Sequence, residues 1–190
     1  MATSAVQVCS NALLLLGAQT INSFDDESDR ALLVANLWPN ALEAILRSHP
    51  WNCAIQRVQL APDAATPPFD YAYQFALPGD CLRILSVGER GENPQFELEG
   101  RKVQFDEALL NLRYVYRNDD IPSWDALLVQ AAEAYMAMTC AYPITKSASM
   151  FEAMGNLWKL KLQQARTIDG LENPPEELGD YPLLAARRSR

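Results

Sequence analysis

The chain has 190 residues, of which 49% are hydrophobic and 21% charged, and its formal net charge is −8 at pH 7. These values are typical of a globular domain with its own core and exclude an intrinsically disordered chain. The negative charge disfavours tight non-specific binding of duplex DNA, because such binding needs Lys and Arg side chains at the phosphates.

Cysteine usage and the first residues indicate the compartment. Cys9, Cys53, Cys81 and Cys140 lie far apart and, with the only histidine, His49, match no zinc-ligand spacing. We expect buried free thiols in a reducing environment. Residues 1–24 carry no charged side chain and lack the basic segment of a signal peptide, and their apolar run is too short to span a bilayer. Cytoplasmic synthesis without membrane association is expected.

Two helices are predicted within residues 4–48. Ser4 caps the first, and Gly17 follows its end. This helix lacks charge, which predicts cover on most sides, with a neighbouring subunit as one source of that cover. Its apolar positions are Val8, Ala12, Leu15 and Leu16.

The second helix is expected to begin with the acidic residues Asp25, Asp26, Glu27 and Asp29, where the helix dipole favours negative charge. Pro39 predicts either a kink or two abutting helices. The sequence His49-Pro50-Trp51 ends this element, and Trp51 is the expected anchor between the helices and the next region. The apolar face, with spacings typical of a helix, comprises Ala31, Val34, Ala35, Trp38, Leu42, Ile45 and Leu46.

From about residue 51 to residue 118 the apolar period changes from 3.6 to 2, which predicts an antiparallel sheet inserted between the second and third helices. Three strands are expected over residues 71–77, 81–87 and 112–116. Residues 95–105 are expected to form a hairpin about Gly100, with Phe96 and Leu98 opposite Val103 and Phe105.

Two more helices are predicted within residues 121–168. Asn118, Asp119 and Asp120 are the expected caps of the third helix, with Pro122 near its first position and Pro143 at its end. Thr145 is the expected cap of the fourth. The expected buried residues are Leu127, Leu128, Ala131, Tyr135 and Met138 in the third helix, and Met150, Phe151, Met154, Leu157, Trp158, Leu162 and Ala165 in the fourth.

The helical pattern ends after Gly170, and residues 171–190 are predicted to form an extended C-terminal arm rather than part of the 1–170 domain. A frayed terminus and a docking arm both fit the composition, but the apolar residues favour docking on another chain. The predicted interface residues are Tyr181, Leu183 and Leu184, which would fill a pocket, and Arg187, Arg188 and Arg190, which would meet acidic surface.

No catalytic residue, cofactor site or metal site is predicted. Pro50 breaks the helix that would place His49 and Cys53 on one face, which disfavours a Cys–His nucleophile. No phosphate-binding glycine loop, dinucleotide fingerprint or nucleophile elbow is present in the sequence. Asp119 and Asp120 are better explained as helix caps than as an acid–base pair.

The order of these elements resembles a known family. Residues 11–60, from NALLLLGAQT through HPWNCAIQRVQL, look like the opening of the tail tubular protein A family, the head–tail adaptors of short-tailed phages. That opening is a short helix, a loop, and a longer helix ending in His-Pro-Trp before a strand. Residues 71–87, YAYQFALPGDCLRILSV, resemble the aromatic strand and Leu-Pro-x-Asp-Cys-Leu turn of the family.

The resemblance covers about the whole chain and implies a non-enzymatic virion protein at the head–tail junction. Such a protein forms a homo-oligomeric, dodecameric ring between the portal protein and a tail nozzle or tail tube protein, and DNA passes through its lumen without specific binding. Relatives also serve as neck proteins of long-tailed phages. The implied fold is mainly α with a β insertion, a four-helix bundle plus a small antiparallel sheet. The alternatives are a DNA-binding packaging or regulatory protein and an unrecognised enzyme.

Overall fold

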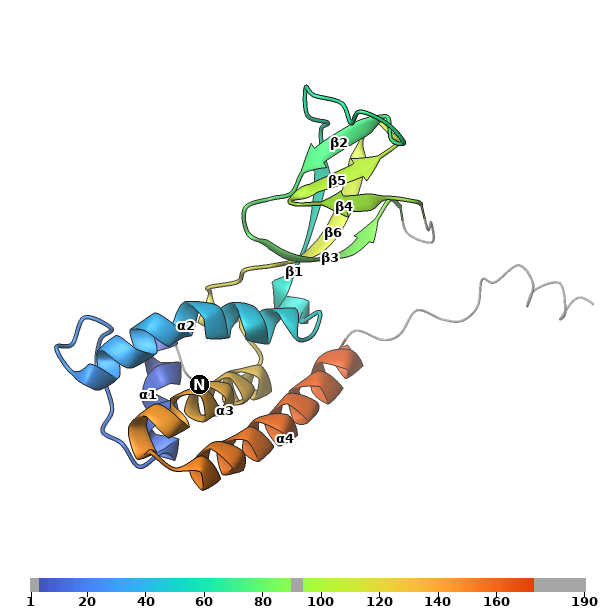
Figure 1. Cartoon of the computed structure of the whole chain (residues 1–190). Coiled ribbons are helices and arrows are strands. Elements are labelled where there is room, and N and C mark those ends of the chain that lie inside the picture. The colour runs from blue at the N-terminus through green and yellow to red at the C-terminus, as the bar shows by residue number, and fades with distance from the viewer. Residues whose placement is uncertain (1–3, 90–93, 173–190) are drawn as a thin grey trace, which may run out of the picture.

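The computed structural model describes residues 4–89 and 94–172, and within them it contains four α-helices and six β-strands (Figure 1). All six strands lie between the second and third helices and pair antiparallel. The predicted α+β fold, a helical bundle with an antiparallel β insertion, is therefore confirmed. The elements are α1 (Ala5–Leu15), α2 (Asp29–Arg47), β1 (Ile55–Leu60), β2 (Tyr73–Ala76), β3 (Cys81–Val87), β4 (Glu97–Glu99), β5 (Lys102–Phe105), β6 (Leu110–Tyr116), α3 (Ala126–Thr145) and α4 (Ala148–Glu172), with short 3₁₀ turns η1 (Asn52–Ala54) and η2 (Ile121–Ser123).

The ends of α1 are set by the two predicted residues. The Ser4 hydroxyl accepts a hydrogen bond from the Gln7 N–H at 3.3 Å. At the other end Gly17 has φ +68°, a conformation that costs glycine little. The chain therefore turns back, and the Gly17 N–H donates to Leu14 O while the Ala18 N–H donates to Leu13 O.

Helix α2 begins later than the acidic run suggests. Ser28 is its cap, and the Ser28 hydroxyl accepts a hydrogen bond from the Ala31 N–H. Asp26 instead organises the preceding loop by accepting hydrogen bonds from the Asn22 and Ser23 N–H groups. Pro39 lies inside one helix, so the expectation of two abutting helices is wrong. The proline is on the exposed face, where water can satisfy the carbonyl that loses its N–H partner.

The insertion forms two three-stranded sheets rather than the single predicted sheet. One has the order β1-β6-β3 and the other β2-β5-β4. The hairpin pairs Leu98 with Val103 as predicted, whereas Phe96 precedes β4. Two packed layers bury apolar residues of both sheets, which one small sheet cannot do alone. The shared core consists of Phe75, Cys81, Val87, Val103, Phe105, Leu110, Leu112 and Tyr114.

Both helices after the sheets begin at later caps than predicted. Asp125 caps α3 by accepting a hydrogen bond from the Leu127 N–H at 2.8 Å. Asn118, Asp119, Asp120 and Pro122 all precede that helix, and Pro122 lies in η2. For α4, the Ser147 hydroxyl rather than that of Thr145 accepts a hydrogen bond from the Met150 N–H. Ser147 directly precedes α4, whereas Thr145 is the last residue of α3.

The ends of α3 and α4 also differ from expectation. Pro143 lies inside α3, two residues before its end at Thr145, so the prediction that it closes the helix is off by two residues. Helix α4 continues through Gly170 to Glu172. The helical part of the chain thus extends past the predicted boundary at residue 170.

Helix α3 is the centre of the bundle and contacts the other three helices, while α4 packs chiefly along α3 (Figure 1). Only one face of α4 is therefore covered, with Leu162, Ala165 and Asp169 buried. Phe151, predicted to be core, is 46% exposed, and Leu157 is only half-buried. The prediction for these two residues is wrong because the helix lies at the edge of the bundle.

Candidate functional site

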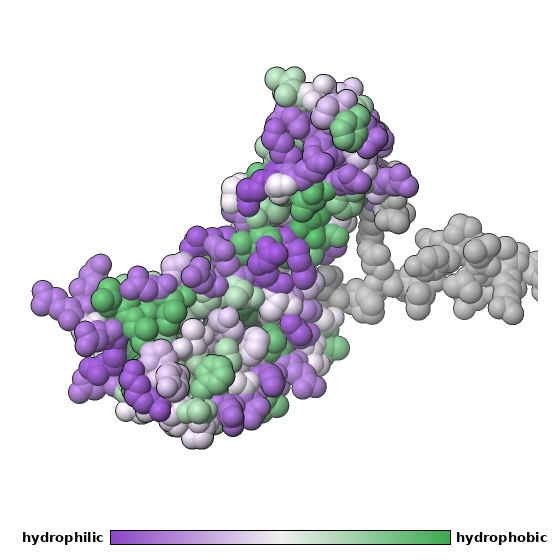
Figure 2. All heavy atoms as spheres, viewed as in Figure 1, coloured by the Kyte–Doolittle hydropathy of each residue, from purple (hydrophilic) through white to green (hydrophobic). Residues whose placement is uncertain are grey.

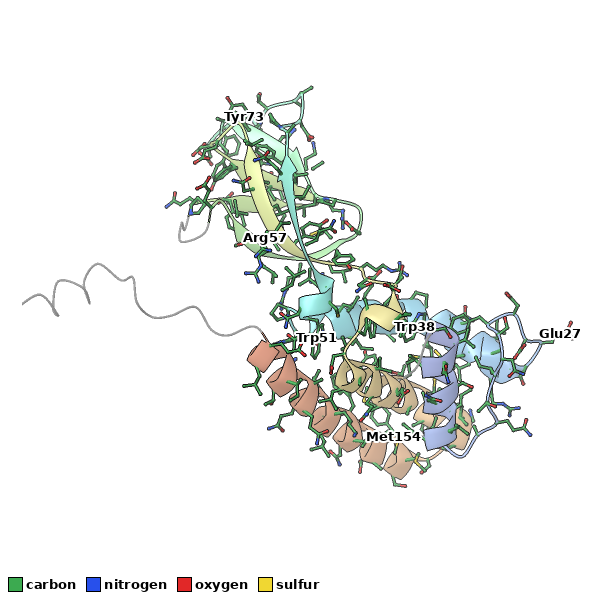
Figure 3. All side chains as sticks on the ribbon, turned by 180° about the vertical axis from the view of Figure 1, so that it is seen from behind. Glu27, Trp38, Trp51, Arg57, Tyr73 and Met154 are labelled. Carbon is green, nitrogen blue, oxygen red and sulfur yellow. The ribbon has the colours of Figure 1, made fainter. Side chains whose placement is uncertain are left out.

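Trp51 lies where the helical bundle meets the sheet unit, here defined as β1–β6 (Figure 3). The residue is 1% exposed, as an anchor between the two regions requires, and its indole Nε1–H donates to Ile45 O at 3.0 Å. Its ring meets that of His49 edge-on, with centroids 4.7 Å apart. Trp51 thus ties the end of α2 to the segment that leads into β1.

The segment that follows the sheet unit is hydrogen-bonded to the segment that precedes it. Asn118, which is buried, donates from Nδ2 to Cys53 O at 2.7 Å, and the Tyr116 hydroxyl donates to the same carbonyl at 3.3 Å. The Arg47 guanidinium donates to Leu82 O of β3. These contacts fix the orientation of the sheet unit on the bundle.

The last turn of α4 is clamped to the same junction by Asp169. One carboxylate oxygen accepts the Asn52 N–H at 2.9 Å, and the other lies 3.1 Å from His49 Nε2. Asn52 Nδ2 donates to Asp169 O at 2.8 Å, and Arg166 Nη2 donates to Ser48 O at 2.6 Å. The point at which the C-terminal arm leaves the domain is therefore held rigidly against the bundle–sheet junction.

Sequence reasoning missed Asp169, although a signal was present. A carboxylate near the C-terminus of a helix faces the negative end of the helix dipole, which is unfavourable without compensating partners. Asp169 is also 8% exposed, so its charge needs hydrogen bonds that only tertiary structure supplies. An acidic residue at that position therefore indicates a contact that the helix itself cannot provide.

The described thiols are not activated for nucleophilic chemistry. Burial raises the pKa of Cys53 to about 12, and the Asp169 carboxylate adds to that increase. Burial also raises the pKa of Cys9 to about 12 and that of Cys140 to about 11. Burial lowers the pKa of His49 although Asp169 opposes that shift. A neutral imidazole already engaged by Asp169, next to protonated thiols, disfavours the Cys–His alternative.

Helix α4 carries a second apolar stripe, which faces away from the bundle core. Leu160, Ile168 and Leu171 are 51%, 37% and 72% exposed, and Leu157 is half-buried. At 100° per residue these four positions fall within about 80° of the helix circumference. We call Leu157, Leu160, Ile168 and Leu171 the outer α4 stripe. Within the described residues, Leu160 and Leu171 remain more than half exposed.

Exposed leucines also occur at the end of α1 and at the start of α2. Leu14 and Leu15 at the end of α1 are 58% and 43% exposed, and Leu32 in the first turn of α2 is 63% exposed. Figure 2 shows hydrophobic surface over the first half of α2, and Figure 1 places this region away from the C-terminal half of α4. Leu15, predicted to be covered, is thus exposed in the single chain. We call these three leucines the α1–α2 patch.

Next to the buried face of α4 lies an open hollow of about 390 Å³. Its polar rim includes the two cationic side chains Lys159 and Arg166, and neither forms an ion pair with a carboxylate among residues 4–89 and 94–172. The complete lining is Lys159, Leu162, Gln163, Arg166 and Thr167. The hollow therefore combines positive charge with an apolar floor.

The predicted interface residues Tyr181, Leu183, Leu184, Arg187, Arg188 and Arg190 lie outside the described residues. The last described residues belong to α4, which ends at Glu172, three residues after Asp169. This end of α4 directly precedes the rest of the predicted arm. The outer α4 stripe and the hollow lie on the same helix. These surfaces were not predicted: Leu157 was assigned to the buried face, Leu160 and Ile168 were given no role, and Leu171 was placed in the arm.

No protein-family model matches the sequence, and no curated protein matches it at a significant level. The described residues include no cluster of three or more His, Cys, Asp or Glu side chains placed to hold a metal ion. No helix in the ranges 4–89 and 94–172 has the length and apolarity needed to cross a membrane.

Proposed function

We propose that this protein is a structural, non-enzymatic subunit of a ring at the head–tail junction of a tailed bacteriophage. The ring joins the portal protein to a tail nozzle or tail tube protein and leaves an axial channel for DNA. The proposal is supported by the order of the elements. A short helix, a loop, a longer helix, an antiparallel insertion and two antiparallel helices match what the adaptor resemblance implies.

The observation that carries the proposal is that the bundle exposes leucines at two places, on the outer face of α4 and at the end of α1 with the start of α2. The outer α4 stripe and the α1–α2 patch consist of different residues, so pairing them joins unlike surfaces of successive subunits. Such head-to-tail contacts generate a closed ring when the rotation between subunits closes. An enzyme or a monomeric DNA-binding domain needs neither surface.

The experiment is a mass measurement of the full-length protein, alone and mixed with a purified portal ring. A multi-subunit particle of ring size, formed alone or on the portal, is the expected result. A protein that stays monomeric at all accessible concentrations and does not join the portal ring would overturn the proposal. An isologous dimer would also overturn it, since a two-fold contact does not build a ring.

DNA passes this ring without being bound. The net charge of −8 leaves few cationic groups for phosphates, and the described Lys and Arg residues are scattered over both units. A gel-shift titration with duplex DNA at physiological salt should therefore show no submicromolar complex. Submicromolar binding would instead favour the packaging or regulatory alternative.

The C-terminal arm serves attachment rather than folding. Tyr181, Leu183 and Leu184 fill a pocket of another chain, and the three terminal arginines meet acidic surface. Deletion of residues 181–190 should leave the thermal unfolding of the domain unchanged while weakening ring formation or partner attachment. Rings and infectious particles that form as well as with the full-length protein would show the arm to be a simple terminus.

A further inference from the structure

The hollow on α4 is a cationic surface in an acidic protein. Lys159 and Arg166 line it and have no carboxylate partner in the described part of the chain. Arg166 is held in place because its Nη2 donates to Ser48 O. Leu162 supplies an apolar floor and Gln163 a hydrogen-bonding side chain. A short acidic peptide with one apolar side chain complements these features in charge and polarity.

The sequence that follows α4 has this composition. Glu176, Glu177 and Asp180 surround Leu178 and Gly179, which gives three carboxylates and one apolar side chain within five residues. The same stretch carries no Lys or Arg. It is the part of the arm for which no role has been assigned so far, since the predicted interface begins at Tyr181.

The acidic stretch of a given chain is poorly placed to reach the hollow of the same chain. Gln163 lies nine residues before Glu172, or about 14 Å back along α4 at 1.5 Å per residue. Only Asn173, Pro174 and Pro175 separate the end of α4 from Glu176. Consecutive prolines favour an extended backbone and disfavour a tight reversal, and they restrict the preceding residue as well. A tight reversal onto the same helix is therefore disfavoured, which favours the hollow of a neighbouring subunit as the binding site.

We propose that the acidic stretch 176–180 of one subunit binds the cationic hollow on α4 of the adjacent subunit. This inference rests on the proposed ring, because it requires an adjacent copy of the chain. Lys159 and Arg166 pair with Glu176, Glu177 or Asp180, and Leu178 covers the floor at Leu162. Each copy of the chain carries both the acidic stretch and the hollow, so the same contact can repeat from one subunit to the next.

The test is a cysteine pair in the full-length chain, Gln163→Cys with Glu177→Cys, under mild oxidation. The described native cysteines are buried or half-buried with raised pKa values, so they contribute little background. A ladder of linked chains on a non-reducing gel is the expected result. The matched control is Ser149→Cys with Glu177→Cys, since Ser149 is exposed on α4 but outside the hollow, and it should give no ladder. A linked single chain, or no link beyond the control, would overturn the inference.

Charge reversal in the cysteine-pair background tests the chemistry of the contact. Lys159→Glu should reduce the ladder, and Lys159→Glu with Arg166→Glu should abolish it. Adding Glu176→Lys should restore linking in the single reversal. Lys159 is exposed, so its reversal leaves folding intact even if the Arg166 change does not. A ladder that is insensitive to the Lys159 change would refute charge pairing.

The masses of the same samples separate this inference from the proposed function. Rings without a ladder would reject the arm contact while leaving the ring in place. Monomers without a ladder would reject both proposals. A ladder that grows only in samples containing rings would support both.

Discussion

Helices α3 and α4 are adjacent in sequence and pack on each other, yet the fraction of their residues that is buried differs greatly. Helix α3 has 20 residues, of which nine are buried, whereas α4 has 25 residues, of which three are buried. Helix α3 is surrounded by the other three helices, and α4 has a single neighbour along most of its length. A helix that keeps exposed leucines after its chain has folded still has apolar surface available for burial by another chain.

The two helices therefore differ in where their stabilisation comes from. The apolar side chains of α3 lose contact with water when the single chain folds. In the proposed ring, the exposed leucines of the outer α4 stripe lose contact with water when a second subunit covers them. The comparison predicts that mutations in α3 act on folding and that mutations on the outer face of α4 act on assembly.

The largest expected loss of stability comes from a substitution at Trp51, in the buried junction between the bundle and the sheet unit. Trp51→Ala removes a fully buried indole and its hydrogen bond to Ile45 O, and should lower the free energy of unfolding by about 3–5 kcal/mol. Phe151→Ala, at an aromatic residue of α4 that is 46% exposed, is the control and should cost much less. Chemical denaturation of both variants measures the difference. Wild-type stability of Trp51→Ala would contradict the anchor assignment.

The same substitution on the two helices sharpens the comparison directly. Leu128→Ala in α3 should cost about 2–5 kcal/mol, because Leu128 is 1% exposed. Leu160→Ala in α4 should change the stability of the monomer by no more than about 0.5 kcal/mol. Equal losses for the two variants under dilute, monomeric conditions would mean that α4 is covered within its own chain.

A smaller effect is expected at the clamp that holds the end of α4. Asp169→Ala leaves the buried Asn52 N–H without an acceptor and should cost about 1–3 kcal/mol in urea unfolding. Asp169→Asn keeps one acceptor oxygen and should cost less. If both variants matched the wild type, the clamp would contribute nothing to the stability of the domain.

The smallest effect concerns pH. Burial, Arg166 and Arg83 lower the pKa of His49 below 6.5, against the opposing influence of Asp169. The unfolded chain therefore binds a proton that the folded chain does not, so the free energy of unfolding should fall as the pH drops below about 6.5. Above about pH 6.5 His49 is neutral in both the folded and the unfolded chain, so this loss of stability is absent. Thermal unfolding of His49→Gln should show a shallower dependence between neutral pH and the acidic range, and an identical slope would contradict the assignment.

Most of the fold could be predicted because it depends on local patterns. Ser4 and Gly17 set the ends of α1 through backbone chemistry, and the change of apolar period at residue 51 marks the insertion. The caps of α3 and α4 were misplaced because several Asp, Asn, Ser and Thr residues compete there. Only the tertiary path of the chain places the side chains of Asp125 and Ser147 within reach of the unpaired N–H groups at the starts of α3 and α4.

The candidate site was harder to predict for a physical reason. Spacing shows that a helix has apolar residues, but it does not show how many neighbours the helix will have. Met154 and Trp158 of α4 do pack on the bundle core, while Leu160 and Leu171 remain exposed because α4 lies at the edge. Asp169 and its partners His49 and Asn52 are more than a hundred residues apart, so no local pattern joins them.

The most direct test of the account is the mass of the double variant Leu160→Asp/Ile168→Asp, measured alone and with a portal ring. Two carboxylates on the outer α4 stripe should leave the chain folded, because both positions are exposed, but should prevent ring formation. Asn156→Asp, an exposed position on α4 outside the stripe, is the control and should form rings like the wild type. A double variant that assembles as well as the wild type would contradict the claim that a neighbouring subunit covers α4.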